Sequence, residues 1–541
     1  MSDKCNALVC LGTGCQSGGA EEILSSLQDE VERLNLGETV QVKQTGCHGF
    51  CQRGPLVIIE PEGIFHSKVT PDDVPEVAQS LLPGGKPVER LFYRDPTTNK
   101  PLPHYSDIPF YGKQQRTLLK NCGHIDPEEI DDYLEVGGYK ALKKALLEMN
   151  GDQIIDEVKR SGLRGLGGAG FPAWRKLEAC RKEDAQIKYV ICNGDEGDPG
   201  AFQDRSVMEG TPHSVLEGMM IAAYSVGAQE GYIYVRAEYP LAVKRLRTAI
   251  SHAKEKGFLG RDILGSGFDF SIEVFQGAGA FVCGESTALV LSIEGERGMP
   301  KASPRPRTTE AGLWGEPTLL NNVKTFSSIP IIIDSGADPF AAVGTENSKG
   351  TAVFALTGKV ENNGLIEVPM GMTLREIIFG IGGGIPDGKT FKAVQTGGPS
   401  GGCLPESALD MPVDFDSLKA AGSIMGSGGL VVMDEDTCMV DLARYFLDFT
   451  QRESCGQCIP CRLGTKQLFD ILNDITNGKG KEGDIDLLLE ISEAVSAGSL
   501  CALGKTAPNP VLTTIRYFRD EYEAHINEKR CPSGVCRLVE P

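Results

Sequence analysis

The sequence predicts a multidomain α/β protein whose last hundred or so residues form an all-α helical bundle. Its 541 residues exceed what one hydrophobic core usually serves. Predicted helices alternate with short apolar runs from about residue 118 to 335, as in an α/β sheet domain, and the apolar spacing after Asp434 is that of helices alone. We therefore expect four domains, over residues 1–90, 91–340, 341–433 and 434–541.

The first domain is predicted to be a compact α/β unit. We expect a helix from Glu21 to Arg33 and extended runs at Thr39–Lys43 and Leu56–Glu60. Glycines and prolines between residues 83 and 103 then indicate a linker.

The other three domains differ in their apolar periodicity. Tyr189–Cys192 and Tyr232–Val235 are the expected strands of the second domain, and the glycine-dense stretch from Thr351 to Met433 predicts a small mixed sheet with tight turns. In the fourth domain the expected buried helix faces are formed by Val440, Ala443, Phe446 and Leu447, and by Leu468, Ile471 and Leu472.

Charge and cysteine content limit the class of protein. A formal charge of −20 argues against nucleic acid or an anionic membrane surface as a partner, because either would repel the chain. No apolar run approaches the ~18 residues needed to cross a bilayer, and Met1–Cys10 resembles no leader, so we expect a cytoplasmic protein without membrane insertion. The 17 cysteines are then expected to bind metals or clusters, since that compartment keeps thiols reduced.

Four cysteines of the last domain predict a [4Fe-4S] cluster. Cys455, Cys458 and Cys461 have two residues between neighbours, and Cys501 follows forty residues later. Three closely spaced thiolates can hold three corners of a cubane, and a distant fourth closes it. A four-cysteine zinc site is the alternative, but such sites usually consist of two C-x2-C pairs.

Two cysteine pairs near the amino terminus predict a [2Fe-2S] cluster. Cys10 and Cys15 have four residues between them, and Cys47 and Cys51 have three. Each pair can chelate one iron of a two-iron core, with structural zinc as the alternative. His48 lies between two of these ligands and is expected to be a packing or hydrogen-bonding residue.

The carboxyl-terminal segment is a candidate zinc site. His525, Cys531 and Cys536 offer three ligands, and Cys438, at the start of a predicted helix, is the candidate fourth. The alternative is two surface thiols and a solvated histidine. The other cysteines are expected to be small buried hydrophobic residues.

Two glycine-rich loops resemble phosphate-binding motifs. Gly383–Thr390 matches the P-loop sequence pattern. The segment before it looks helical and the segment after it looks like a strand, whereas a P-loop follows a strand and precedes a helix. We therefore discount triphosphate binding there. Gly162–Gly170 precedes a predicted helix from Ala173, so its backbone can approach a phosphate, but it follows a helix rather than a strand and is a weak signal alone.

An acidic run strengthens the second loop. Asn193, Asp195, Glu196 and Asp198 directly follow the predicted strand that ends at Cys192. They place an amide and three carboxylates where α/β sheets bind ligands. An acidic surface turn is the alternative.

Six motifs together resemble one known family. They are Gly-Leu-Gly-Gly-Ala-Gly-Phe-Pro (165–172), Asn-Gly-Asp-Glu-Gly-Asp-Pro-Gly (193–200), Tyr-Val-Arg-Ala-Glu-Tyr (234–239), Gly-Ala-Gly-Ala-Phe-Val-Cys-Gly-Glu (277–285), Asn-Asn-Val (321–323) and Ser-Cys-Gly-Gln-Cys-Ile-Pro-Cys-Arg (454–462). From about residue 120 to 520 the chain resembles the NADH-binding flavoprotein subunit of complex I. The first domain is similar to thioredoxin-like [2Fe-2S] ferredoxins, and its fusion to the flavoprotein resembles multimeric, often electron-bifurcating, NAD-linked hydrogenases.

The resemblance implies a binding site for FMN and for NAD(H) or NADP(H) and a β-grasp fold for residues 341–433. Hydride transfer to a flavin does not strictly need a catalytic acid or base, so none is assigned. Phe171 and Phe281 would stack on the adenine of the dinucleotide, with Glu196 and Asp198 near its nicotinamide. The residues implied to surround FMN are Gly165, Gly167, Lys176, Asn193, Asp195, Glu196, Gly197, Tyr234, Glu238, Asn321 and Asn322.

Three departures from the family pattern affect the dinucleotide more than FMN. Leu166 stands where arginine is usual, Ala179 where a third stacking aromatic can occur, and Asp198 where glutamate is usual. They leave the pose of the dinucleotide, and the preference between NAD and NADP, open.

The implied function is electron input to a cytoplasmic redox complex. Hydride would pass between NAD(P)H and FMN, and single electrons between FMN and the clusters. The expected setting is an electron-bifurcating hydrogenase, with a small thioredoxin-like [2Fe-2S] subunit and a larger multi-cluster subunit as partners and ferredoxin as a further candidate. The alternatives are a diaphorase subunit of an NAD-dependent formate dehydrogenase, a non-bifurcating NADH dehydrogenase, and a non-catalytic zinc-binding scaffold.

Overall fold

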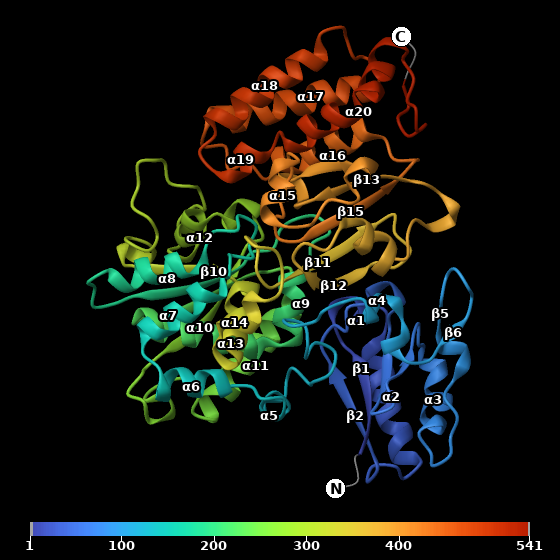
Figure 1. The fold of residues 1–541 in the computed structure, drawn as a ribbon, viewed down its shortest axis with the longest axis vertical. Coiled ribbons are helices and arrows are strands. Elements are labelled where there is room, and N and C mark those ends of the chain that lie inside the picture. Colours follow the sequence, from blue (N-terminus) through green and yellow to red (C-terminus); the bar gives the residue numbers. More distant parts are fainter. Residues whose placement is uncertain (1–3, 539–541) are drawn as a thin grey trace.

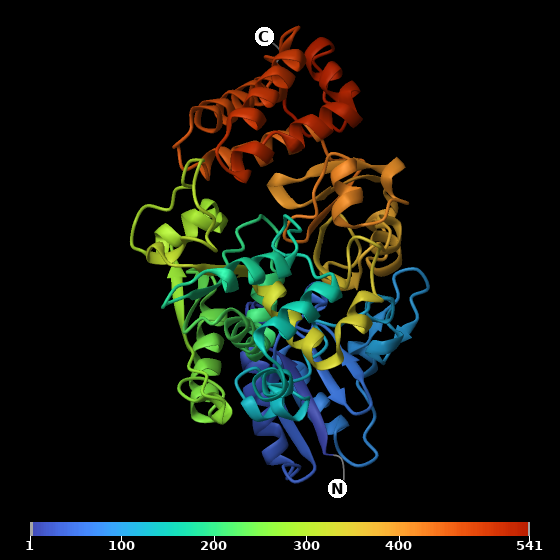
Figure 2. The ribbon, with the colours of Figure 1, turned by 60° about the vertical axis from the view of Figure 1, so that its left-hand side comes forward.

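The computed structural model describes residues 4–538 as four packed parts arranged along the long axis of the molecule (Figure 1 and Figure 2). The amino-terminal domain lies at one end and the helical domain at the other, with the α/β and glycine-dense domains between them. Within the described residues, no helix is both long and apolar enough to cross a membrane.

The amino-terminal domain is a four-stranded sheet with helices packed against it. Its elements are β1 (Cys5–Cys10), α1 (Thr13–Gln16), α2 (Ala20–Arg33), β2 (Val40–Thr45), β3 (Val57–Glu60), β4 (Ile64–His66) and α3 (Val74–Ser80). The strand order is β2-β1-β3-β4, with β1 parallel to β2 and antiparallel to β3. The expected helix and two strands are confirmed as α2, β2 and β3, whereas the central strand β1 was not predicted.

A linker with little regular structure leads to the second domain. It contains a short hairpin, β5 (Tyr93–Arg94) with β6 (Pro101–Leu102), and one helical turn, α4 (Pro109–Gly112). Phe110 of α4 is fully buried and stacks on Phe50 of the first domain with ring centroids 4.1 Å apart. The linker is therefore packed onto the cysteine-bearing loop of the first domain.

The second domain is built on a parallel sheet in the order β10-β7-β8-β9. Its strands are β7 (Tyr189–Gly194), β8 (Glu230–Arg236), β9 (Ser271–Gly277) and β10 (Thr318–Asn322). Its helices are α5 (Ile130–Glu135), α6 (Lys140–Glu148), α7 (Gly151–Ser161), α8 (Ala173–Lys182), α9 (Gln203–Gly210), α10 (Pro212–Val226), α11 (Pro240–Glu255), α12 (Ser286–Ile293), α13 (Val323–Ser335) and α14 (Ala337–Ala341). The two expected strands are confirmed within β7 and β8.

Both faces of this sheet are covered, as parallel sheets require. Along β7, Val190 and Cys192 join the main core with α10 and α13, whereas Tyr189 and Ile191 join a second cluster with α12. Cys461 of the helical domain belongs to that second cluster. The helical domain therefore packs directly on the α12 side of the sheet domain.

The third domain is a five-stranded mixed sheet in the order β12-β11-β15-β13-β14. Its elements are β11 (Thr351–Gly358), β12 (Gly364–Pro369), β13 (Phe391–Thr396), β14 (Gly402–Pro405), α15 (Phe415–Ala420) and β15 (Gly429–Asp434). A π-helical turn at Glu376–Ile381 precedes the loop at Gly383–Thr390, and β13 follows it, so the order opposite to that of a P-loop is confirmed. Lys389 of this loop instead bonds to Asp436 at 2.6 Å.

The fourth domain is a helical bundle. Its helices are α16 (Met439–Arg452), α17 (Thr465–Thr476), α18 (Asp484–Gly498), α19 (Ala502–Thr506) and α20 (Asn509–Asn527). Both predicted helix faces are buried, and α20 packs on β14 of the third domain. All 17 cysteines of the chain, which lie within the described residues, are free thiols.

Candidate functional site

The site begins where the strand order of the parallel sheet reverses. The chain runs from β7 through β8 to β9 and then returns to place β10 on the other side of β7. Ligands of open α/β sheets bind in the crevice outside the carboxyl ends of such strands. Asn193 at the end of β7 is the register partner of both Asn322 on β10 and Tyr234 on β8. Three of the predicted site residues are therefore neighbours at this crevice.

Buried polar atoms without hydrogen-bond partners lie near the same strand ends, where the crevice is expected. The side chain of Asp195 is fully buried, and neither carboxylate oxygen accepts a hydrogen bond. Arg236 Nη1, 3.7 Å from Asp195 Oδ1, and Asn321 Nδ2 also lack partners. Burial raises the pKa of Asp195 to about 7 even though Arg236 opposes that shift. Because buried polar groups are rarely left unsatisfied, this set fits a polar ligand with hydroxyl groups, such as the ribityl chain of FMN.

Glycines bring the backbone close to these side chains. A Cβ atom at Gly167 would lie 2.9 Å from the Cβ of Asn322, and one at Gly197 would lie 2.4 Å from Arg236 Nη1. The N–H of Gly165 donates to the carbonyl of Phe171 at 2.8 Å, which closes the loop at 165–171. The predicted glycines therefore stand where a side chain would displace a site residue.

The other predicted FMN residues have partners within the chain. Lys176 Nζ, whose pKa burial lowers to about 8, donates to the carbonyl of Leu320 beside Asn321 at 2.8 Å. Tyr234 is fully buried, with its hydroxyl 2.9 Å from Ser292 Oγ. Glu238 is half exposed and accepts a bond from Arg236 Nη2 at 2.9 Å.

Glu196 and Asp198, predicted to lie near the nicotinamide, are already hydrogen-bonded; Glu196 is buried and Asp198 is partly buried. Glu196 caps α9, accepting the backbone N–H groups of Asp204 at 3.0 Å and Arg205 at 3.1 Å. Asp198 accepts a bond from Ser427 Oγ of the third domain at 2.6 Å. Burial raises the pKa of Glu196 to about 7 and that of Asp198 to about 6.

The two predicted stacking rings differ in their surroundings. Phe171 is 46% exposed, whereas Phe281 is partly buried and meets Phe449 of the helical domain edge-on, with ring centroids 5.4 Å apart. The backbone N–H of Phe281 donates to Glu453 at 2.8 Å. The aromatic contacts within residues 4–538 do not join Phe171 to Phe281, so their shared stacking on adenine stays a prediction.

Sequence reasoning missed a buried ion pair beneath this site. Lys324 Nζ lies 2.7 Å from Asp204 Oδ1 and donates to the carbonyl of Ser427 at 3.0 Å. Asn322 Nδ2 also donates to Asp204, at 2.6 Å. Lys324 directly follows the Asn-Asn-Val motif and could have been noticed there. Asp204 belongs to no motif, and only the fold brings it under the site.

The four cysteines predicted for the [4Fe-4S] cluster meet at one cavity. Cys455, Cys458, Cys461 and Cys501 all line it, together with Val282, which directly follows Phe281. Four converging thiols of this spacing are the donor set that a cubane requires, so the residues fit the cluster.

The four amino-terminal cysteines form another group, on loops of the first domain. The Sγ atoms of Cys47 and Cys51 are 3.7 Å apart, and the thiol of Cys10 interacts with those of both Cys15 and Cys47. Two adjoining pairs of thiols fit a two-iron core. His48 Nδ1 is 2.7 Å from the Tyr111 hydroxyl, and the ring lies against His124, consistent with a packing and hydrogen-bonding residue.

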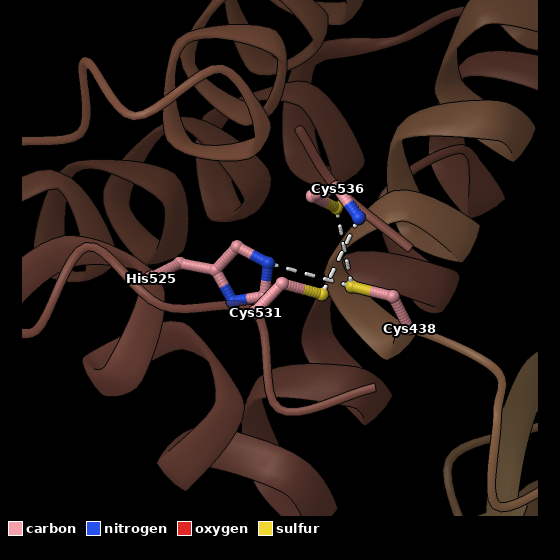
Figure 3. A group of neighbouring side chains, drawn as sticks. All are labelled: Cys438, His525, Cys531 and Cys536. Carbon is pink, nitrogen blue, oxygen red and sulfur yellow. Dashed lines mark hydrogen bonds between the residues drawn. The ribbon is translucent and has the colours of Figure 1, made fainter. Parts of the chain in front are cut away.

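The carboxyl-terminal candidates also converge (Figure 3). One ligand atom each of Cys438, His525, Cys531 and Cys536 lies within 4.8 Å of the others. His525 Nε2 is 3.6 Å from Cys438 Sγ, while its Nδ1 bonds to the carbonyl of Glu521 at 2.7 Å. Hydrogen bonds from Cys536 and His525 hold the pKa of Cys438 well below its usual range. Three thiols and an oriented imidazole fit a tetrahedral zinc ion.

Four family profiles match successive parts of the chain. They are a "Thioredoxin-like [2Fe-2S] ferredoxin" over residues 2–82, a "Nuo51 FMN-binding domain" over 158–331, an "SLBB domain" over 353–404 and an "NADH-ubiquinone oxidoreductase-F iron-sulfur binding region" over 441–525. These profiles agree with the order of domains seen in the structure, and they support the predicted FMN, [4Fe-4S] and [2Fe-2S] cofactors.

Two relatives are similar over most of the chain. The "NADP-reducing hydrogenase subunit HndC" of Solidesulfovibrio fructosivorans is 58% identical over 79% of this chain and 86% of its own. An NADH-quinone oxidoreductase component of Rhizobium meliloti (strain 1021) is 44% identical over 77% of this chain and 98% of its own. Among solved structures, an "NAD+-reducing [NiFe]-hydrogenase in the H2-reduced state" is 28% identical with a TM-score of 0.69, covering 97% of this chain and 84% of that one.

Proposed function

The chain belongs to the family of NADH-binding subunits that carry FMN and a [4Fe-4S] cluster, and from this membership we propose that it is the electron-input subunit of an NAD(P)-linked hydrogenase complex. FMN, when bound, would exchange a hydride with NAD(P)H and single electrons with the clusters. The similarity to a subunit of an NADP-reducing hydrogenase supports the hydrogenase setting.

One observation carries the proposal: a single short segment joins the crevice to the cysteine cavity. Phe281 packs against Gly197 of the acidic loop, since a Cβ there would lie 2.8 Å from its ring, and Val282 lines the cavity of the four cysteines. Glu453 holds the Phe281 backbone and lies two residues before Cys455. A flavin at the crevice and a cluster in the cavity would therefore share one wall, which suits transfer of single electrons between them.

The chain's own residues would bind and orient the cofactors. Asp195 and Asn321 offer a buried acceptor and a buried donor to hydroxyl groups of the ligand, and Asn193, at the end of β7, pairs in register with Asn322 next to Asn321. Because the strands fix these side chains, their positions need little reorganisation on binding. The loop at 165–171 and Phe281 are the segments we assign to the dinucleotide.

Purified protein should separate this function from that of a zinc-binding scaffold. We expect a yellow-brown protein containing FMN, iron and acid-labile sulfide, with visible absorbance that NADH or NADPH bleaches under anaerobic conditions. The rates with the two dinucleotides would decide the preference between them. A colourless protein that contains zinc but no iron or flavin, or a coloured one that neither dinucleotide bleaches, would contradict the proposal.

The finer setting of the subunit is also a proposal. Its two groups of cluster-type cysteines lie on different domains, the amino-terminal domain and the helical domain. Two cluster sites served by one flavin would allow the two electrons of a hydride to leave separately, which supports an electron-bifurcating complex. We propose that the partners are a small thioredoxin-like [2Fe-2S] subunit and a larger multi-cluster subunit. We also propose that the complex works in the reducing environment of the cytoplasm, which keeps cysteines available as cluster and zinc ligands and does not favour disulfides.

We propose further that Cys438, His525, Cys531 and Cys536 bind zinc and hold the carboxyl-terminal segment against the start of α16. The Glu521 carbonyl fixes His525 through Nδ1, which leaves Nε2 directed at Cys438. Fixing one ring nitrogen to free the other is the usual arrangement around a zinc-binding histidine. The site has no exchangeable position in this arrangement, as expected of structural zinc.

Cys536→Ser should lower bound zinc without lowering iron. The substitution removes a ligand, so the loss of zinc affinity should exceed the roughly 10- to 100-fold cost of altering an outer-shell partner. Elemental analysis of zinc and iron per chain measures both. Cys5→Ser, a thiol outside all three groups, should change neither. Unchanged zinc in Cys536→Ser would refute the ligand set.

A further inference from the structure

The cysteine-bearing loops of the first domain face the rest of the chain. A Cβ on Gly46 would lie 2.2 Å from the Cα of Gly210, at the end of α9, so the two backbones touch. On the other side, the carbonyl of Gly49 accepts the N–H of Leu365 in β12 at 2.7 Å. A two-iron cluster on these loops would therefore sit in a fixed interface between domains, in contrast to one exposed for a diffusing partner.

Helix α9 connects this interface to the nucleotide crevice. At its amino end, the carboxylate of Glu196 in the acidic loop accepts the first free N–H groups, those of Asp204 and Arg205. At its carboxyl end, Glu209 reaches the loop between Cys10 and Cys15, where it accepts the backbone N–H of Thr13 at 3.1 Å and the Thr13 hydroxyl. The eight residues of α9 are thus hydrogen-bonded to the acidic loop at one end and to the loop of Cys10 and Cys15 at the other.

Glu209 places a buried carboxylate beside the loop of Cys10 and Cys15, and Arg205 forms a long ion pair with it. The Glu209 side chain is 1% exposed, and Arg205 Nε lies 3.9 Å away without making a hydrogen bond to it. The Arg205 guanidinium instead lies over the ring of Tyr239, 5.4 Å from its centroid. Both oxygens of Glu209 act as acceptors toward Thr13, as an ionised carboxylate does.

We propose that Glu209 is a positioning residue for the [2Fe-2S] cluster, which anchors the Cys10–Cys15 loop on α9 and lowers the reduction potential of the cluster through its charge. Reduction adds one negative charge to a cluster, so a buried carboxylate nearby disfavours it, and cluster potentials respond to such local charge and hydrogen bonding. The inference rests on the proposed ligands Cys10, Cys15, Cys47 and Cys51.

The test is a redox titration of the full chain followed by electron paramagnetic resonance. Glu209→Gln keeps the size of the side chain and one acceptor for the Thr13 backbone N–H, its amide can donate to the Thr13 hydroxyl, and the charge is removed. We expect the midpoint of the [2Fe-2S] signal to rise by at least a tenfold change in the reduction equilibrium, about 59 mV for one electron. The [4Fe-4S] signal of the same sample should not move and serves as an internal control.

Thr13→Val separates the charge from the anchoring bond. It removes the hydroxyl donor but leaves Glu209 ionised, so we expect a smaller shift than in Glu209→Gln. An equal shift in the two variants would overturn the role of the charge. Glu209→Gln could also lose the two irons of the cluster. In that case Glu209→Asp should retain them, because aspartate keeps the charge and the second acceptor oxygen. Loss of the two irons in Glu209→Asp as well would overturn the anchoring role.

Different results would contradict the role of Glu209 and the set of four cysteine ligands. Cys47→Ser should abolish the [2Fe-2S] signal, and a signal that survives it would overturn the ligand set and the inference together. If Cys47→Ser does abolish the signal while Glu209→Gln leaves both iron content and midpoint at wild-type values, the inference alone is overturned.

Discussion

Replacing Asp195 by asparagine is expected to weaken FMN binding by about 1.5–3 kcal/mol, or roughly 10- to 150-fold in Kd. The Asp195 carboxylate is fully buried, and neither oxygen accepts a hydrogen bond within the described chain, so it is free to accept hydrogen bonds from ligand hydroxyls. Asparagine keeps the shape but replaces one acceptor by a donor and removes the charge. Flavin fluorescence during titration of FMN into the cofactor-free protein measures the change.

The same substitution should change how the FMN-free protein responds to pH. The folded-state pKa of Asp195 is raised to about 7 by burial, so the folded protein holds a proton that the unfolded chain releases at lower pH. The Asp195 carboxyl group therefore stabilises the folded protein most below its pKa in the unfolded chain, about 4. This contribution is lost as the pH rises from about 4 through 7. Asp195→Asn should reduce that loss in thermal denaturation of the FMN-free protein.

Asp73→Asn is the matched control for the FMN titration. Asp73 is also buried, but it lies in the first domain, where it bonds Thr70 and Arg90. It should leave FMN affinity unchanged. If Asp195→Asn binds FMN as tightly as the wild type does, Asp195 does not accept hydrogen bonds from FMN and the prediction is wrong.

Most of the fold could be predicted because its elements are specified locally. The apolar spacing of Val440, Ala443 and Leu447 is set by the helix itself, and these residues are buried as expected. The cysteine groups were found in the same way, since ligand spacing along the chain reflects the geometry of the cluster. Strand β1 was missed because its buried run, Cys5–Cys10, also contains cysteine and asparagine and has no alternation.

The parts of the site that escaped prediction depend on contacts between distant segments. Asp204 meets Lys324 only because β7 and β10 are neighbours in the sheet, and Ser427 of another domain bonds Lys324 and Asp198. Glu209 contacts Thr13 across 196 positions of sequence. Such pairs leave no periodic trace in a single sequence. The sequence motifs thus located the loops that we assign to the ligands, whereas the residues that hold those loops in place required the structure.

Replacing one of the four cysteines in the helical domain is expected to remove the whole [4Fe-4S] cluster. Cys461 is 5% exposed and its Sγ lies 3.2 Å from Ser454 Oγ, so the Cys461→Ser side chain would remain buried without a thiolate to hold iron. We expect the [4Fe-4S] resonance and its four irons to disappear while the [2Fe-2S] resonance and bleaching of FMN by NAD(P)H remain.

Loss of this cluster should also destabilise the helical domain, since cluster binding contributes to folding energy, and each 1 kcal/mol corresponds to about 4–8 °C in Tm for a domain of this size. Cys501→Ser should behave in the same way although it lies forty residues away in sequence, because both cysteines line one cavity. Cys403→Ser is the control: this thiol is equally buried, bonds Gln395 at 2.9 Å and belongs to no cysteine group. An intact [4Fe-4S] resonance in Cys501→Ser would place the fourth ligand elsewhere and break the proposed link between the crevice and the cluster.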